Sequence, residues 1–336
     1  MSEFINQPQG GPLDGKIISR LNHMLNATAN FIYTPSEECD VWKVSSDQDQ
    51  DRCLWLKRHV HRGRAHKEAQ VYVQWLSQLN ISAYLVDQPD SRTLLLSHIP
   101  GVPWISIDKS ERYKALTAVG QSIATLHTLA VEDTDSMSLK NAVMKRWDAT
   151  LCGTQSYVST SIYQTLREVV VACKEIMNRD EYIDLLGERC VCHRDLRLEN
   201  LRWASDLERA YLLDFGQARL DWWGSDWVKL ALELSTDYFD VAWRAYRCTS
   251  RSPFGSLDKE RRYRWLVDQG ALMYALGTLN WAVKRQYPDA IYRGYQELKS
   301  ALSFQINQHE SSTHYTLNAL LRSLRTQFTQ SHFGAR

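Results

Sequence analysis

The stretch His193-Arg194-Asp195-Leu196-Arg197-Leu198-Glu199-Asn200 decides how this sequence is interpreted, together with a second short string downstream, Asp214-Phe215-Gly216. The apolar run Tyr211-Leu212-Leu213 precedes the second string directly. Such a run predicts a buried strand that ends at Asp214. We therefore expect this strand to deliver the Asp214 carboxylate to a cleft.

The two strings match, at every defined position, the kinase catalytic-loop pattern H-R-D-x-x-x-x-N and the metal motif D-F-G. Phosphoryl transfer needs one carboxylate to accept the hydroxyl proton and hard oxygen ligands to hold Mg²⁺ against the phosphates. We predict Asp195 for the first task and Asn200 and Asp214 for the second. The alternative is a chance match in a solvated loop, but the order of loop, buried strand and D-F-G favours the functional interpretation.

Size, charge and cysteine content restrict the class of protein. The chain has 336 residues, enough for two lobes, and its 40 basic and 39 acidic residues leave a net charge of +1. No general attraction to nucleic acid or membrane follows, and no apolar run reaches membrane-spanning length. The N-terminal residues lack the pattern of a signal peptide, so we expect a cytoplasmic protein.

Among the seven cysteines, Cys190-x-Cys192 has no matching pair at zinc spacing, which favours reduced core thiols.

Residues 1–98 alternate short apolar runs with one clear helix. Helical spacing is found in 13–25 and 64–79, and the strand-like runs are 40–44, 52–57, 84–86 and 93–96. The break Pro100-Gly101-Val102-Pro103 follows, and most of the sequence beyond Ser110 has helical periodicity. The sequence thus predicts an α+β, two-lobed protein-kinase-like fold. Residues 1–98 form the small strand-rich nucleotide-binding lobe and residues 99–336 the large, mainly helical catalytic and acceptor-binding lobe.

Lys57 and Glu68 are predicted to form the pair that holds the nucleotide phosphates. Lys57 ends the second strand of a predicted hairpin, where a kinase places its phosphate-binding lysine, and Glu68 is the only carboxylate in the next helix. The alternative is an exposed strand-end lysine and a solvated helix glutamate. The downstream strings favour the paired arrangement.

These residues give the chain a resemblance to the aminoglycoside phosphotransferase and choline kinase family of small-molecule kinases. The matching segments are Lys57, Glu68, the hinge 94–101, the helix end 120–127, the catalytic loop 191–203, the metal loop 212–220 and the helix start 226–230. The resemblance implies ATP with Mg²⁺ as cofactors. It also implies that the Ser97 carbonyl and the Ile99 amide contact adenine and that Arg197 touches the γ-phosphate. His127 and His193 are then expected to orient loops, and Asp226 to cap a helix.

The chain departs from the family pattern in two places. The phosphate-covering loop should lie within residues 33–40, yet this segment has no glycine and contains Glu37 and Glu38, which repel phosphate unless they point outward. His-Arg-Asp replaces the commoner His-Gly-Asp and makes the loop look like that of a protein kinase. However, no A-P-E string follows Asp214, and Asp226 comes too soon for a long activation loop. We therefore expect a small-molecule acceptor rather than a protein.

The acceptor itself is predicted to contact the helical region after Asp226. Trp223 belongs to a set of aromatic residues that either form a box for a cationic amino alcohol or pack between helices. Asp237 and Asp240 either receive an amino sugar or form a solvated helix face. The sequence thus predicts an ATP- and Mg²⁺-dependent phosphotransferase acting on a hydroxyl of an aminoglycoside, amino alcohol, sugar or related metabolite. A protein kinase-like enzyme and a nucleotide-binding pseudokinase or scaffold are the alternatives.

Overall fold

The computed structural model describes residues 13–25, 29–35, 39–46, 53–130, 139–179, 182, 189–249, 256–308 and 315–330. Contacts within the chain divide it into two compact units, each built from two separate segments. The first unit contains Met1–Leu126 and Glu199–Arg219, and the second contains His127–Leu198 and Leu220–Arg336. The lobe boundary after residue 98 stays a prediction.

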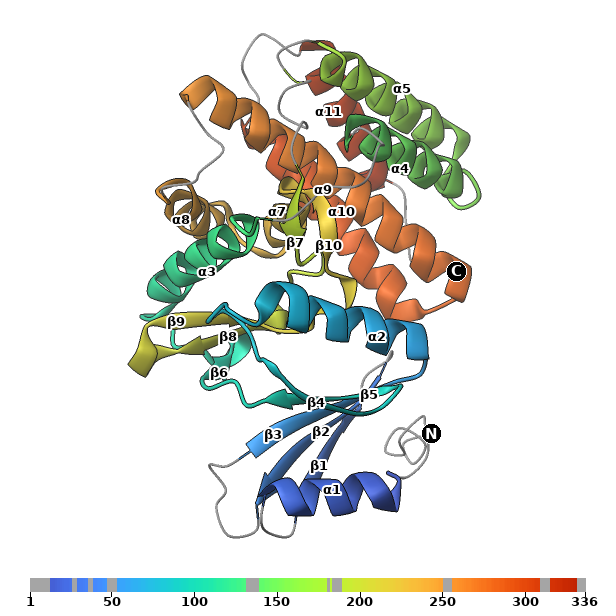
Figure 1. Cartoon of the computed structure of the whole chain (residues 1–336). Coiled ribbons are helices and arrows are strands. Elements are labelled where there is room, and N and C mark those ends of the chain that lie inside the picture. The colour runs from blue at the N-terminus through green and yellow to red at the C-terminus, as the bar shows by residue number, and fades with distance from the viewer. Residues whose placement is uncertain are drawn as a thin grey trace. The chain divides into compact units, whose positions relative to one another are not determined.

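The first unit is built around a five-stranded antiparallel sheet with the order β1-β2-β3-β5-β4 (Figure 1). Its strands are β1 (Ala29–Pro35), β2 (Cys39–Ser46), β3 (Cys53–His59), β4 (Leu85–Asp90) and β5 (Thr93–Ser97). Helix α1 (Gly15–Leu25) buries Ile17, Leu21 and Leu25, which lie four residues apart, against Trp42 and Leu56 of the sheet. The four-residue spacing places these side chains on one helix face, which explains why the segment is helical and where it packs.

Helix α2 (Arg62–Val71) packs against β3 and β5 and continues into a π-helical turn, Tyr72–Leu76. The sequence predicts a single helix over 64–79, because apolar periodicity does not reveal one extra residue in a turn. Tyr72 is buried, and its ring meets the Phe215 ring edge-on at 6.0 Å.

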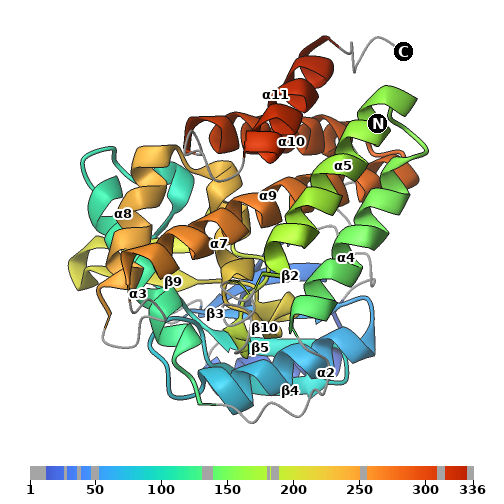
Figure 2. The same cartoon turned by 90° about the horizontal axis from the view of Figure 1, so that it is seen from above.

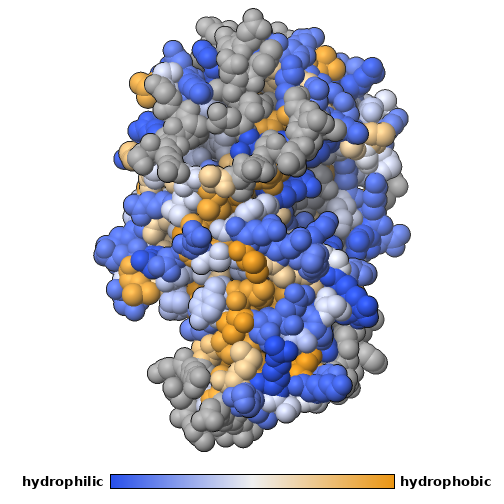
Figure 3. All heavy atoms as spheres, in the orientation of Figure 1, coloured by the Kyte–Doolittle hydropathy of each residue, from blue (hydrophilic) through white to orange (hydrophobic). Residues whose placement is uncertain are grey.

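A second, three-stranded sheet completes the first unit, with the order β6-β8-β9. It contains β6 (Val102–Pro103), β8 (Leu201–Ala204) and β9 (Arg209–Leu212), and α3 (Arg112–His127) follows β6 in the chain. Gly101 has φ +93°, and a Cβ there would lie 2.3 Å from the Trp203 carbonyl oxygen, so only glycine allows this close approach to β8. Over the five-stranded sheet, the face in Figure 3 shows hydrophobic residues between hydrophilic ones.

The second unit is mainly helical. It contains α4 (Leu139–Thr154), α5 (Thr160–Met177), β7 (Arg189–Cys192), β10 (Arg219–Trp222), α7 (Gly224–Glu233), α8 (Thr236–Arg247), α9 (Leu257–Arg285), α10 (Pro288–Gln308) and α11 (Tyr315–Gln330). Helices α9 and α10 run side by side, and α9 also contacts α7 and α4 (Figures 1 and 2). Strands β7 and β10 pair, so the predicted catalytic loop begins directly after a paired strand. Within the described ranges, no helix is long and apolar enough to cross a membrane.

Candidate functional site

The structure brings Lys57 and Glu68 together in the first unit. Lys57 Nζ lies 3.0 Å from Glu68 Oε1 and 2.9 Å from Oε2, and Glu68 is fully buried. Glu68 Oε2 also lies 2.7 Å from His59 Nε2. Burial lowers the pKa of Lys57, but the carboxylates of Glu68 and Asp214 outweigh this effect and hold the pKa well above its usual value. Lys57 is therefore a buried, charged ammonium with a fixed direction.

Asp214 and Asn200 also lie in this part of the first unit. Asp214 Oδ1 is 2.7 Å from Lys57 Nζ, and the Asp214 side chain is about half exposed. The Asp214 backbone is left-handed (φ 59°), and its carboxylate accepts a hydrogen bond from the Gly216 N–H at 3.3 Å. The Leu213 N–H donates to the Asn200 carbonyl oxygen at 2.9 Å, which ties the two chain segments together.

All six residues predicted for nucleotide and metal binding in this unit line one cavity of about 310 Å³. Its lining includes Lys57, Glu68, Ser97, Ile99, Asn200 and Asp214, with apolar surface from Val41, Ala83, Leu96 and Leu213. Trp55 and Arg202 line it as well, with the Arg202 guanidinium 5.9 Å from the Trp55 ring centroid. Sequence reasoning missed these two residues. Their positions, two residues before Lys57 and two after Asn200, are the only signal that the sequence offers.

The structure describes the two ends of the predicted phosphate-covering loop, residues 33–35 and 39–40, as parts of β1 and β2. Strand β1 ends at Pro35 and β2 begins at Cys39, and the backbones of these strands pair up to Pro35 opposite Asp40. Glu37 and Glu38 belong to 36–38, which the structure does not describe. Their direction relative to a phosphate stays a prediction.

Asp195 lies in the second unit within a cluster of charged side chains. Its carboxylate forms an ion pair with Lys229 of α7, and Arg197 Nε lies 3.7 Å away. The Lys229 side chain is 8 % exposed, and its Nζ lies 4.8 Å from the centre of the Tyr274 ring. Burial raises the pKa of Tyr274, but Lys229 and Arg197 lower it overall. The predicted base is thus accompanied by a buried lysine that the sequence interpretation did not include.

Arg197 connects the catalytic loop to three helices. Its Nη1 lies 3.0 Å from Glu233 of α7 and 3.1 Å from Glu297 of α10, and its Nη2 donates to the Tyr274 hydroxyl of α9 at 3.0 Å. Burial lowers the pKa of Arg197, but Tyr274 and the two glutamates raise it above its usual value. Its predicted contact with a γ-phosphate stays a prediction.

The prediction that Asp226 caps a helix is wrong. Helix α7 begins two residues earlier, with Trp223 at the N-cap position and no side-chain cap. The Asp226 carboxylate instead accepts the backbone N–H groups of His193 at 2.9 Å and Arg194 at 2.6 Å, and lies 3.1 Å from His127 Nε2. Burial lowers the pKa of His127, but hydrogen bonds to Asp226 and Cys192 outweigh it and raise the pKa to about 9. A charged histidine and an aspartate therefore hold the start of the catalytic loop.

Arg194 occupies a backbone conformation that favours glycine, with φ 64°. An arginine is strained in this conformation and therefore needs support here. The Arg194 N–H is bound by Asp226, and Arg194 Nε lies 2.8 Å from Asp221 Oδ2. Burial raises the pKa of Asp221, but Arg146 and Arg194 lower it overall, so this carboxylate is ionised.

The residues predicted for the acceptor lie in different surroundings within the second unit. Trp223 is 5 % exposed and contacts Trp222, Trp243, Tyr246 and Tyr263, an arrangement of ordinary core packing. Asp237 is exposed at the start of α8. Asp240 Oδ1 is 2.9 Å from Arg264 Nη1. Their role with an acceptor stays a prediction.

Cys190 and Cys192 are free thiols with their sulfur atoms 3.5 Å apart. Together with His127 they place three potential metal-ligand atoms within 4.8 Å of one another. The pKa of the Cys192 thiol is well above its usual value, mainly because it is buried. Both His127 ring nitrogens already have partners, the Tyr246 hydroxyl at 2.9 Å and Asp226. Cys192 is buried and Cys190 is half-buried, and the expectation of reduced core thiols stays a prediction.

Comparison with solved structures shows the same fold at low sequence identity. An aminoglycoside phosphotransferase, APH(4)-Ia, is similar with a TM-score of 0.64 and 11% identity, covering 86% of this chain and 98% of that one. A choline/ethanolamine kinase family protein from Mesorhizobium loti has a TM-score of 0.63 and 14% identity, with 92% and 98% covered. The macrolide 2'-phosphotransferase MphH from Brachybacterium faecium has a TM-score of 0.60 and 14% identity, with 85% and 98% covered.

These similarities confirm the predicted fold class, with a strand-rich N-terminal part and a mainly helical C-terminal part. No curated protein sequence matches the chain significantly. A family model described as "Phosphotransferase enzyme family" matches residues 36–266, more than half of the chain. The predicted resemblance is thereby confirmed, and the chain belongs to the phosphotransferase enzyme family.

Proposed function

We propose that this protein transfers the γ-phosphoryl group of ATP, in the presence of Mg²⁺, to a hydroxyl group of a small molecule. The observation that carries the proposal is the buried Lys57–Glu68 pair, which directs an ammonium group at Asp214 inside a cavity of about 310 Å³. Burying a charged pair costs desolvation free energy, so a gain in stability is a weak explanation for such a pair. A fixed ammonium group in a cavity is the device that positions nucleotide phosphates.

The nucleotide would lie along this cavity. Ser97 and Ile99 offer a backbone carbonyl and an amide for the adenine edge, and Val41, Ala83 and Leu213 offer apolar surface for its faces. Lys57 would contact the α- and β-phosphates while Glu68 keeps it in place. Arg202, next to Trp55, adds a second cation to the cavity wall.

Mg²⁺ fits the chemistry of two residues at this cavity. Asn200 and Asp214 supply an amide and a carboxylate oxygen, the hard donors that Mg²⁺ prefers, and the Asp214 side chain is about half exposed. When bound, the ion would neutralise phosphate charge. Asn200 and Asp214 would then orient the phosphate end of the nucleotide.

In the reaction, Asp195 would accept the proton of the acceptor hydroxyl as its oxygen forms a bond to the γ-phosphorus. The bond between this phosphorus and the β–γ bridging oxygen breaks, and ADP leaves with the electron pair. Lys229 and Arg197 surround the Asp195 carboxylate, and Asp226 fixes the loop that carries it. Asp195 is therefore held in a fixed orientation before the acceptor arrives.

The acceptor is a small hydroxylated compound in this proposal, because the sequence has no A-P-E string after Asp214 to form a protein-docking platform. Structures of similar fold are described as aminoglycoside and macrolide phosphotransferases and as a choline/ethanolamine kinase family protein. Within the described part of the second unit, Glu233 and Glu297 are already engaged by Arg197. A cationic acceptor would have to displace an internal guanidinium to reach them. The Asp195 cluster thus favours uncharged hydroxyl compounds such as sugars over aminoglycosides.

A screen of ATP consumption tests this function. Purified protein is offered aminoglycosides, macrolides, amino alcohols, sugars and nucleosides with Mg²⁺, and products are identified by mass spectrometry. Asp195→Asn is the matched control: it should bind ATP as the wild type does but lose about 100- to 10,000-fold in turnover. Phosphorylation of polypeptides and of none of these compounds would indicate a protein kinase. Nucleotide binding without any turnover would indicate a pseudokinase.

A further inference from the structure

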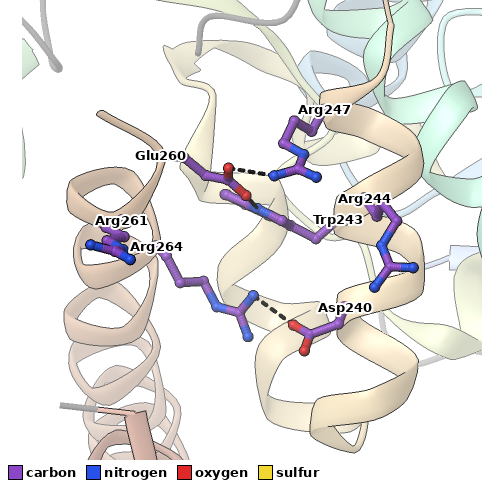
Figure 4. A pocket seen from close by; sticks show the side chains of 7 residues that line it. All are labelled: Asp240, Trp243, Arg244, Arg247, Glu260, Arg261 and Arg264. Carbon is purple, nitrogen blue, oxygen red and sulfur yellow. Dashed lines mark hydrogen bonds and ion pairs between the residues drawn. The ribbon is translucent and has the colours of Figure 1, made fainter. Parts of the chain in front are cut away.

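A second cavity lies in the second unit, between α8 and α9 (Figure 4). Its volume is about 270 Å³, and it is lined by Asp240, Trp243, Arg244, Arg247, Glu260, Arg261 and Arg264. Four of these seven residues are arginines and two are carboxylates, so the lining carries two positive charges in excess. The whole chain has a net charge of only +1, so this is a local concentration.

Two of the arginines are held in place by the carboxylates. Arg247 Nη1 lies 2.7 Å from Glu260, whose other oxygen accepts the Trp243 indole N–H at 3.0 Å. Arg264 Nη1 lies 2.9 Å from Asp240 (Figure 4). The Arg264 guanidinium is also 4.0 Å from the Phe239 ring centre. The Arg264 side chain is 12 % exposed. These guanidinium groups are therefore oriented without a ligand.

The other two arginines, Arg244 and Arg261, are exposed at the rim. Arg261 lies 3.7 Å from Asp258, but both side chains are at least three-quarters exposed. An ion pair in such a position is screened by water and contributes little. These two side chains can therefore turn towards a ligand at small energetic cost.

We propose that this cavity binds a small anion through a phosphoryl group carrying two negative charges. Guanidinium groups match phosphate oxygens because their planar N–H pairs donate two parallel hydrogen bonds. Two arginines held by carboxylates and two exposed ones at the rim surround such a site, and the excess of two charges matches a dianion. Asp240 acts here as the partner that orients Arg264, which differs from its predicted contact with a cationic acceptor.

The site is separate from the Asp195 cluster within the same unit. Helix α9 contributes Arg264 to the cavity and Tyr274 to the Asp195 cluster. Ten residues of α-helix span about 15 Å. The ligand of this cavity is thus a different molecule, or a different part of one, from the hydroxyl that Asp195 would contact.

Isothermal titration calorimetry of the full-length protein with inorganic pyrophosphate, without Mg²⁺, tests the proposal. The variant is Arg244→Gln/Arg261→Gln, which removes only exposed side chains, and its fold is checked by circular dichroism and melting temperature. Arg262→Gln is the control, because Arg262 is on the same turn of α9 and does not line the cavity. We expect the wild type to bind one pyrophosphate in this cavity, besides any that the cavity proposed for the nucleotide accepts beside Lys57. The double variant should weaken it at least about tenfold, whereas the control should weaken it by less than about threefold.

Two results would overturn the proposal. Pyrophosphate binding that is absent in the wild type, or unchanged in the double variant, would show that this cavity is not the site. Equal weakening by Arg262→Gln would show general charge attraction. Inorganic phosphate and a hexose 6-phosphate distinguish a free anion from a phosphorylated metabolite, and binding of either supports the site. Citrate binding as tight as pyrophosphate binding would refute recognition of a phosphoryl group.

Discussion

Lys229 is the residue whose substitution reports most directly on the Asp195 carboxylate, since the two form an ion pair beside Tyr274. A nearby cation favours the charged form of a carboxylate. Lys229→Met should therefore shift the acidic limb of the pH–rate profile for phosphotransfer to higher pH. The measurement is kcat/KM against pH with the acceptor found in the screen. Lys229→Arg keeps the charge and should keep the wild-type limb, and an unmoved limb in Lys229→Met would contradict the assigned contact.

Arg194 allows a second test at the same scale, because its left-handed backbone can be separated from its side-chain contacts. Arg194→Gly and Arg194→Ala both lose the ion pair with Asp221, yet only glycine adopts φ 64° without strain. Arg194→Gly should be more stable than Arg194→Ala by about 1 kcal/mol in chemical denaturation. Equal stabilities would mean that the strain has been relieved elsewhere.

Asp214 is the residue on which the proposed magnesium site depends. Asp214→Ala removes the only charged ligand of the proposed pair and should abolish magnesium-dependent ATP binding in calorimetry. Asn200→Ala removes a neutral ligand and should weaken that binding less. Wild-type affinity in Asp214→Ala would remove this residue from the site.

Helix α7 shows at the level of elements what the sequence predicts and what it leaves out. Its charged residues Asp226, Lys229 and Glu233 share one face of an otherwise apolar helix, a signal that this face meets polar partners. Their partners, among them Arg197 and His127, come from segments that meet α7 only after folding. Lys57 and Glu68, by contrast, are on a strand and the next helix, so local order alone predicts their contact.

The contact between His127 and Asp226 predicts a pH dependence of stability. The pKa of His127 is raised from 6.5 to about 9. Its contribution to the free energy of unfolding is therefore fully present below pH 6.5 and is lost as pH rises towards 9. The amount is on the order of 3 kcal/mol at most. In denaturant titrations at pH 6 and pH 9, wild type should lose more stability than His127→Asn over this interval. Parallel losses would show that the His127–Asp226 pair does not carry the effect.

At the scale of the whole molecule, cutting the chain after residue 98 would remove part of the lining of the cavity proposed to bind the nucleotide. Asn200, Arg202 and Asp214 line that cavity, and they follow residue 98 by more than a hundred positions. A fragment of residues 1–98 should therefore show no measurable binding of Mg²⁺-ATP and should unfold with low cooperativity in a thermal melt. Binding by the fragment with the affinity of the full chain would contradict the cavity as described.

The two-segment construction of the first unit also has a consequence for its synthesis. Its first segment ends at Leu126 and its second at Arg219, so the ribosome must make the whole of 127–219 before β8, β9 and Asp214 are available. At 5 to 20 residues per second this interval lasts about 5 to 20 s. During that time β6 has no β8 to pair with, and Lys57 cannot yet form its ion pair with Asp214. The emerging chain is thus exposed to chaperones and proteases for seconds, and slow codons between 127 and 219 would lengthen this period.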